Sequence, residues 1–355
     1  MKHTDTSDKA TRGFERFSRL LACPVCVAPL EPQAMGLMCG RCGSVYPIRD
    51  GVPIFTPDPQ NVITVPFDGE GHPIPPEFIK KLASVDGYSL NIGAGATNVS
   101  IPQSIQLECY IFKNTDVVGD AHRLPFIDEA FDAVAAFSVF EHLCDPPAAV
   151  AEAFRVLKPG GEVIIHTAFL QPLHESPLHY YNATEHGLLR WFSDFDIESC
   201  RVSDNFQPAH TIAWLSNDLI LYLEEAFGPE WGRRLAMTNL DQWRQLWIDK
   251  SKRCNDPLWD ILSKLPQQTQ KRLCARFELT AKKPIGASQT TRTHSLRAIG
   301  RGDRRGDQDE IRHLKWRIAW HEEQTDMNML ARDAQIRGLQ ADLDMIKSST
   351  TWRAG

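Results

Sequence analysis

Four cysteines near the amino terminus have the spacing of metal ligands. They form two Cys-x-x-Cys pairs, Cys23 with Cys26 and Cys39 with Cys42, separated by twelve residues. Two such pairs can place four thiolates tetrahedrally around one Zn²⁺, and four protein ligands leave no open position for catalysis. We therefore predict a structural zinc ribbon, with a redox dithiol as the alternative.

A glycine-containing turn follows a short apolar run farther along the chain. Residues 88–92 have the pattern of a buried strand, and Gly93-Ala94-Gly95 would end that strand in a tight turn. Glycine has no Cβ, so the backbone of such a turn can lie directly against a ligand, as in dinucleotide-binding loops. Taken alone, the motif also fits an ordinary strand-to-helix turn.

The elements around this turn alternate between strand and helix. We expect strands at 116–120, 131–137 and 162–166, and a helix over 145–157 that begins with Asp-Pro-Pro and ends before Lys-Pro-Gly-Gly. This alternation predicts an α/β fold with a doubly wound, mostly parallel sheet. Ligands of such sheets bind beyond the carboxyl ends of the strands, where the glycine turn would lie.

Composition narrows the class of protein. The chain has 355 residues, of which 42% are hydrophobic and 24% charged, as in soluble globular proteins. A formal net charge of -6 gives no global basic field for nucleic acid. We find no apolar run long enough for a membrane span and no apolar core of a secretory signal near the start. Nine cysteines used in this way suit a reducing compartment, so we expect a cytoplasmic protein.

The cysteine pairs belong to a longer pattern. Together with Tyr-Pro-Ile-Arg-Asp-Gly-Val-Pro at 46–53, they resemble the small zinc-ribbon domain of the methyltransferase-activator family, over about residues 20–57. Residues 44–55 predict a strand, an Asp-Gly turn and a second strand. We also expect Gly40 and Gly43 to supply the positive φ angles of the zinc knuckles. In bacteria this domain is often fused ahead of a methyltransferase.

The central region resembles a class I S-adenosylmethionine-dependent methyltransferase, which has a Rossmann-like fold. Five blocks carry the resemblance, in the family's order, across residues 88–168: Gly93-x-Gly95, 119–126, 131–134, 141–143 and 155–161. The resemblance implies S-adenosyl-L-methionine as cofactor. It also implies that Gly93 and Gly95 lie against the methionine part of the cofactor. Asn91 departs from the family, because it replaces the acid usually found there and lacks the strength of a charged acceptor.

The same resemblance assigns the other cofactor-binding positions. Glu108 corresponds to the acid at the ribose hydroxyls, although an exposed charge at a strand end is the alternative. Asp120, beside the backbone amide of Ala121, corresponds to the acid near the adenine amine, with a turn cap as the alternative. Ser138 lies where backbone groups approach the amino acid end of the cofactor.

Catalysis of this class needs mainly alignment of acceptor and methyl group, because the sulfonium is already a strong electrophile. A hydroxyl acceptor would also need a general base, for which His142 is the candidate, with a structural role as the alternative. The loop at 171–181 supplies His174, His179 and Tyr180 as expected acceptor contacts. Metal binding by this loop is an alternative that its spacing does not favour.

We divide the chain into six segments. They are a zinc ribbon at 20–57, a linker at 58–76, the methyltransferase core at 77–210, a helical extension at 211–282, a flexible linker at 283–309 and a helical or coiled-coil tail at 310–347. Within the core we expect helices at 77–84 and 184–192 and one further strand at 195–202. A short heptad pattern in the tail predicts self-association through the C-terminal helix.

These observations predict a methyltransferase that acts on a small-molecule or glycan-type acceptor. The Ser-Ser-Thr-Thr-Trp-Arg ending at 348–353 is similar to the tail of bacterial surface-polysaccharide glycosyl- and methyltransferases, which suggests a role in polysaccharide biosynthesis. One alternative is a nucleic-acid methyltransferase, which the acidic composition disfavours. The other is a non-catalytic cofactor-binding scaffold that acts through the ribbon and the coiled tail.

Overall fold

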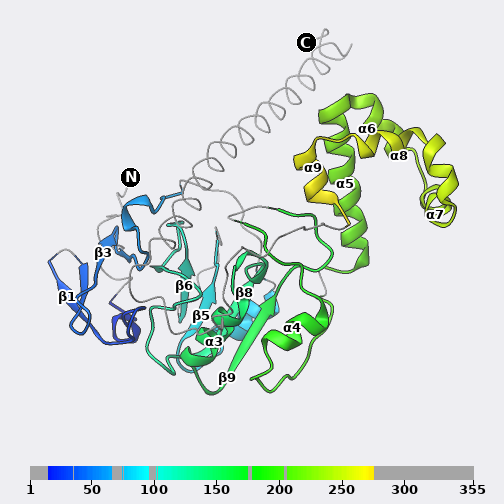
Figure 1. Cartoon of the computed structure of the whole chain (residues 1–355). Coiled ribbons are helices and arrows are strands. Elements are labelled where there is room, and N and C mark those ends of the chain that lie inside the picture. The colour runs from blue at the N-terminus through cyan, green and yellow to red at the C-terminus, as the bar shows by residue number, and fades with distance from the viewer. Residues whose placement is uncertain are drawn as a thin grey trace, which may run out of the picture. The chain divides into compact units, whose positions relative to one another are not determined.

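The computed structural model (Figure 1) describes residues 15–34, 36–65, 74, 76–95, 101, 103–174, 178–203 and 206–275. All of them belong to the first of two compact units, Met1–Arg276 and Phe277–Gly355. The predicted linker at 283–309 and coiled-coil tail at 310–347 lie outside the described residues.

A small antiparallel sheet forms the amino-terminal region, where Figure 1 labels β1 and β3. Its strands lie in the order β1-β2-β3-β4. The last two are joined by Asp50 and Gly51, with φ angles of 50° and 78°, as a two-residue hairpin turn requires. The strands are β1 (Leu30–Gln33), β2 (Gly36–Cys39), β3 (Val45–Arg49) and β4 (Val52–Pro53).

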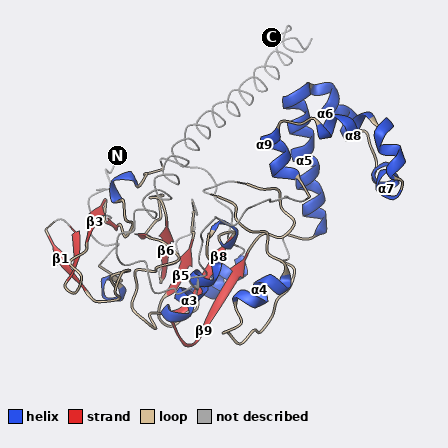
Figure 2. Cartoon of the chain, viewed as in Figure 1, coloured by secondary structure: helices blue, strands red, loops and turns tan. Residues whose placement is uncertain are grey.

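A five-stranded parallel sheet forms the centre of the unit, as Figure 2 shows in red. The strand order is β7-β6-β5-β8-β9. Successive strands are added on one side of β5 up to β7, and the next strand, β8, is added on the other side of β5, so the strand order reverses between β5 and β8. Ligands of open parallel sheets bind at such a switch point, beyond the carboxyl ends of the strands. The predicted fold class is confirmed. The strands are β5 (Ser89–Ile92), β6 (Ser104–Glu108), β7 (Val117–Val118), β8 (Phe131–Phe137) and β9 (Leu157–His166).

Two helices cover opposite faces of this sheet because strand side chains alternate between faces. From α2 (Pro76–Ala83), Leu82 packs in one cluster with Ala133 and Ala135 of β8. From α3 (Pro146–Val156), Val150 packs in another cluster that includes Val134 of the same strand. The helix α3 begins as predicted, with Asp145 capping its first turn by accepting a hydrogen bond from the amide of Ala148.

The remaining described segments are helical, apart from loops. A small core of Leu223, Leu235 and Leu265 holds several of these helices together. The further strand predicted at 195–202 does not form. Ile197 and Val202 are 46% and 63% exposed, so the apolar pattern there finds no sheet to pack on. The helices are α4 (Glu185–Trp191), α5 (Pro208–Phe227), α6 (Pro229–Ala236), α7 (Leu240–Ile248), α8 (Pro257–Ser263) and α9 (Gln267–Leu273), and the short 3₁₀ turns are η1 (Ser18–Leu20), η2 (Pro59–Asn61), η3 (Phe140–His142) and η4 (Lys250–Asn255).

The amino-terminal region is docked on the parallel sheet. The amide of Phe55 donates to the carbonyl of Val118 in β7 at 2.8 Å, which extends the sheet edge. The amide of Ala22 donates to the carbonyl of Pro125 at 3.0 Å. One buried apolar cluster contains residues of both regions, including Phe17, Leu21, Cys39, Tyr46, Leu90, Phe126 and Phe131. The two regions therefore share a core.

Candidate functional site

The four cysteines of the amino-terminal region meet in one cluster. The sulfur of Cys23 lies 3.5 Å from that of Cys42, and the sulfur of Cys26 lies 3.5 Å from that of Cys39. All four sulfurs lie within 4.8 Å of one another. Thiolates around a tetrahedral zinc, with Zn–S bonds of about 2.3 Å, are about 3.8 Å apart. The cysteines therefore fit a four-thiolate zinc site.

Each cysteine knuckle closes at the residue that follows its second cysteine. Gly43 has a φ of 75°, and its amide donates to the carbonyl of Cys39 at 2.9 Å. Val27, with a φ of 56°, takes the same place in the first knuckle, where its amide donates to Cys23. Gly40 lies between two cysteines and has no positive φ, so its predicted role is wrong. The knuckle geometry imposes the strained φ on a β-branched valine.

Two hydroxyl groups support these cysteines. The Tyr46 hydroxyl lies 3.0 Å from the Cys23 sulfur, and the Ser44 hydroxyl lies 3.2 Å from the Cys42 sulfur. Hydrogen bonds from Ser44 lower the pKa of Cys42 to about 6, so this thiol is ionised at neutral pH. Ionised sulfur is the form that binds a metal.

The glycine turn lies at the switch point of the parallel sheet. Gly93 and Gly95 have φ angles of 68° and 58°, in the left-handed region that glycine adopts without strain. A Cβ added to Gly93 would lie 2.3 Å from a methyl group of Val139, which follows β8. Among the described residues, a Cβ on Gly95 would meet nothing within 4 Å. Gly93 is thus a packing glycine, whereas no described residue fills the space beside Gly95.

Glu108 and Ser138 flank this turn from the neighbouring strands. One carboxylate oxygen of Glu108 accepts a hydrogen bond from the amide of Gly95 at 2.5 Å, and the other accepts from the amide of Cys109 at 2.9 Å. The carboxyl is nearly buried, which raises its pKa, although both amides oppose that rise. Ser138 has a φ of 56°, a strained conformation for a residue other than glycine.

Asn91 does not interact with the glycine turn through any contact seen among the described residues. It is 1% exposed, and its side-chain NH2 group donates to the side-chain oxygen Oε1 of Gln106 at 2.8 Å. Its own amide oxygen has no partner among the described residues. Asn91 and Gln106 are register partners in β5 and β6, so this position forms a buried polar pair between neighbouring strands.

Asp120 is paired with a histidine that the sequence analysis did not single out. The Nδ1 atom of His122 lies 2.6 Å from an Asp120 oxygen, which also accepts from the His122 amide at 2.9 Å. Burial lowers the pKa of His122, but the bond to Asp120 and the nearby Cys144 outweigh it and raise the pKa to about 10. Partial desolvation raises the pKa of Asp120, but the hydrogen bonds and charge of His122 outweigh it and lower that pKa. Ala121, between them, is buried. The spacing of Asp120 and His122, two residues apart in the sequence, could have indicated this ion pair.

Three predicted histidines come together beside the ends of β8 and β9. The ring of His174 lies 5.1 Å from that of His142 and 4.6 Å from that of His179, both edge-on. Burial lowers the pKa of His142, which favours the neutral ring. Tyr180 is joined to the group by its backbone, since its amide donates to the carbonyl of Glu141 at 2.7 Å. Glu141, fully buried below the rings, was not predicted as a site residue.

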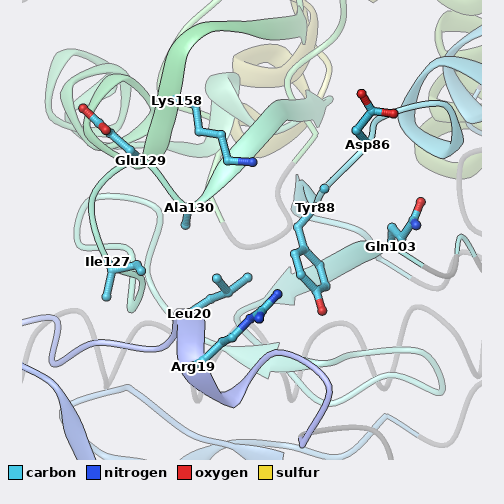
Figure 3. A pocket seen from close by; sticks show the side chains of 10 residues that line it. Arg19, Leu20, Asp86, Tyr88, Gln103, Ile127, Glu129, Ala130 and Lys158 are labelled. Carbon is cyan, nitrogen blue, oxygen red and sulfur yellow. The ribbon is translucent and has the colours of Figure 1, made fainter.

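A cavity of about 540 Å³ lies at the opposite edge of the sheet. Figure 3 shows the side chains that line it. Tyr88, Gln103 and Ala130 immediately precede β5, β6 and β8, and Arg19 comes from the amino-terminal region. This is the amino edge of the strands, whereas open parallel sheets bind their ligands at the carboxyl edge. The glycine turn, at the carboxyl edge, is therefore the better candidate for a ligand site than this cavity.

Two family models match the chain. Residues 92–165 match the methyltransferase domain, and residues 15–51 match the Trm112p-like protein. The first match contains the parallel sheet from the end of β5 into β9, and the second contains the four cysteines with strands β1 to β3.

Individual proteins are similar over parts of the chain. An uncharacterized methyltransferase of Schizosaccharomyces pombe is 43% identical over 72 residues, which cover 20% of this chain and 24% of that protein. A demethylmenaquinone methyltransferase of Mycolicibacterium paratuberculosis is 45% identical over 49 residues, covering 14% and 21%. The structure of an S-adenosylmethionine-dependent methyltransferase from Aquifex aeolicus has a TM-score of 0.27 and 17% identity, covering 34% of this chain and 78% of that one. The matches thus span about a quarter or less of either curated relative.

Proposed function

We propose, from the premise that the chain carries a methyltransferase domain behind a Trm112p-like domain, that it transfers a methyl group from S-adenosyl-L-methionine to a small-molecule or glycan-type acceptor. The observation that carries the proposal is the switch point. There no described residue fills the space beside Gly95, and the amide of Gly95 donates a hydrogen bond to the buried carboxylate of Glu108. A cofactor with an amino acid end and a ribose needs a backbone without side chains that it can approach closely, and a carboxylate that accepts hydrogen bonds from the ribose hydroxyls.

The residues at the switch point suit the cofactor's parts. Gly95 lets the methionine part approach the backbone, and Glu108 can accept from the ribose hydroxyls. Asp120, held by His122, is 55% exposed and can accept from the adenine amine. When bound, the cofactor supplies an electrophilic methyl group. The strained backbone of Ser138 would face the amino acid end of the cofactor.

The acceptor is expected on the side of the histidines. His142 lies in η3, directly after the turn that contacts Gly93 through Val139, so its ring is close to the cofactor end of β8. Its Nδ1 atom lies 2.8 Å from the carbonyl of Leu178 and donates to it, so Nε2 is the nitrogen that could accept a proton from an acceptor hydroxyl. We propose His174, His179 and Tyr180 as further acceptor contacts. The acid-rich composition favours an acceptor other than RNA.

We further propose that the four cysteines hold one structural Zn²⁺. All four positions are taken by thiols, so the metal would stabilise the amino-terminal region and take no part in the reaction. The reduced cysteines also support a cytoplasmic location. No helix among the described residues is long and apolar enough to cross a membrane.

Calorimetry with S-adenosyl-L-methionine tests the proposal. We expect a single site with micromolar affinity, and an absence of binding at millimolar cofactor would contradict the enzyme and leave a non-catalytic scaffold. Radiolabelled cofactor, offered with glycan precursors in one arm and total RNA in another, then separates the two acceptor classes. Label found only in RNA would overturn the small-molecule or glycan acceptor.

A further inference from the structure

We propose that Glu141, His142 and His174 bind one divalent transition-metal cation beside the methyl-transfer site, a site distinct from the four cysteines. The potential ligand atoms of these three residues lie within 4.8 Å of one another. Two histidines and one carboxylate form a ligand set that binds Zn²⁺ and Fe²⁺ in other proteins and keeps open positions for a substrate oxygen.

The buried carboxylate of Glu141 is the main observation behind this proposal. Glu141 is 0% exposed, and its Oε2 atom accepts a hydrogen bond from the hydroxyl of Thr167 at 2.9 Å. Its Oε1 atom is buried and has no partner among the described residues. A buried carboxylate oxygen without a partner is costly, whereas a metal ion would satisfy it.

The two histidines are oriented as metal ligands usually are. The Nδ1 atom of His142 lies 2.8 Å from the carbonyl of Leu178, and the Nδ1 atom of His174 lies 3.1 Å from the carbonyl of Pro172. A metal-binding histidine almost always donates its other ring N–H to a carbonyl or carboxylate, which fixes the ring and its tautomer. Both rings would then bind the cation through Nε2.

His179 holds this arrangement and is not itself a ligand. Its Nε2 atom lies 2.9 Å from the side-chain oxygen of Asn182, and its Nδ1 atom accepts from the amide of His174 at 3.4 Å. Around a tetrahedral cation with bonds of about 2.1 Å, ligand atoms are about 3.4 Å apart. The three ligand atoms, which lie within 4.8 Å of one another, would therefore move together by up to about 1.4 Å when the cation binds.

The position of the cluster at the edge of the sheet indicates that the cation would bind the acceptor. Glu141 and His142 follow β8, and Thr167 follows β9, so the site lies beyond the carboxyl edge of the sheet. If the proposed methyl transfer is correct, the open positions would take an oxygen of the acceptor. The acceptor class would then be one that presents a hydroxyl or carboxylate oxygen, and His142 would act as a ligand in place of a base.

Metal stoichiometry tests the site without any assay of methyl transfer. The full chain is incubated with Zn²⁺, dialysed and measured by mass spectrometry for bound metal. We expect two equivalents in the wild type and one in Glu141→Gln and in His174→Ala. His186→Ala, which changes an exposed histidine of α4, is the matched control and should keep two.

Co²⁺ in place of Zn²⁺ separates the two centres. Cobalt bound to cysteine gives a sulfur-to-metal charge-transfer band, and this band should be unchanged in Glu141→Gln while the second equivalent is lost. A wild type that holds only the cysteine-bound equivalent would overturn the proposal. Two equivalents in a chain that does not bind S-adenosyl-L-methionine would support the metal site and refute the proposed methyl transfer.

Discussion

The ion pair between His122 and Asp120 sets the charge at the position that we propose for the adenine of the cofactor. The Nδ1 atom of His122 lies 2.6 Å from the Oδ1 atom of Asp120, and the side chain of His122 is 19% exposed. Because the folded pKa of about 10 lies above the ordinary value of 6.5, the pair stabilises the fold fully below pH 6.5. That stabilisation is lost as the pH rises through about 10.

Replacement of His122 therefore has a pH-dependent effect on stability. In His122→Gln we expect the free energy of unfolding to fall by about 0.5–1 kcal/mol at pH 6, as for a partly exposed ion pair. The difference from wild type should shrink toward zero above pH 10, because the wild-type histidine is then neutral. Urea denaturation at several pH values measures this, with His186→Gln as the control. A difference that does not change between pH 6 and pH 10.5 would contradict the charged pair.

Thr167 is expected to position the carboxylate of Glu141 in the proposed metal site. Loss of such a supporting hydrogen bond typically weakens metal affinity by about 10–100-fold. We expect this loss in Thr167→Val, measured by competition of the second Zn²⁺ equivalent against a chelator. Thr167→Ser keeps the hydroxyl and should restore the affinity. Equal affinities of the two variants would remove Thr167 from the site.

The two glycines of the turn after β5 are expected to have different roles, Gly93 in packing and Gly95 in ligand binding. Gly93→Ala would bring a Cβ to 2.3 Å from Val139, so we expect it to destabilise the fold by about 1–3 kcal/mol. In Gly95→Ala the Cβ meets nothing within 4 Å among the described residues, so we expect a cost of only about 1–2 kcal/mol from the positive φ. That Cβ would, however, occupy the space that we propose for the cofactor.

Thermal unfolding and calorimetry on the same two variants measure this contrast. We expect Gly95→Ala to lose at least about tenfold in affinity for S-adenosyl-L-methionine, equivalent to about 1.4 kcal/mol, while it remains folded. Unchanged affinity in that variant would place the methionine part of the cofactor elsewhere.

The elements that were predicted correctly depend on residues close in the sequence, whereas the features that were missed depend on residues far apart in the sequence. The hairpin at Asp50-Gly51 and the capped helix after Asp145 depend on near neighbours in the chain, and both form as expected. The strand at 195–202 needed a partner strand, which the local pattern cannot report. Glu141 was missed as a site residue for the same reason, because His174 joins it only through the fold.

At the scale of the whole described unit, the amino-terminal region and the parallel sheet unfold together if they share a core. Leu21 and Phe126 form a bridge between the two regions, and Ile54 pairs with Val118 of β7. Buried Cys39 belongs to the same apolar cluster as Phe131 of β8. Loss of the proposed zinc would therefore also destabilise the parallel sheet that carries the glycine turn, although no cysteine lies at that turn.

Removal of a zinc ligand tests this coupling. In Cys39→Ser we expect one cooperative unfolding transition with a midpoint at least about 5 °C lower, equivalent to about 2 kcal/mol or more. Affinity for S-adenosyl-L-methionine should fall in the same variant, because β7 and β5 belong to one sheet. Cys254→Ser, at an exposed cysteine of η4, is the control and should change neither quantity. Two separate transitions, with cofactor affinity intact, would show that the amino-terminal region is an independent module, since a shared core cannot lose one side without destabilising the other.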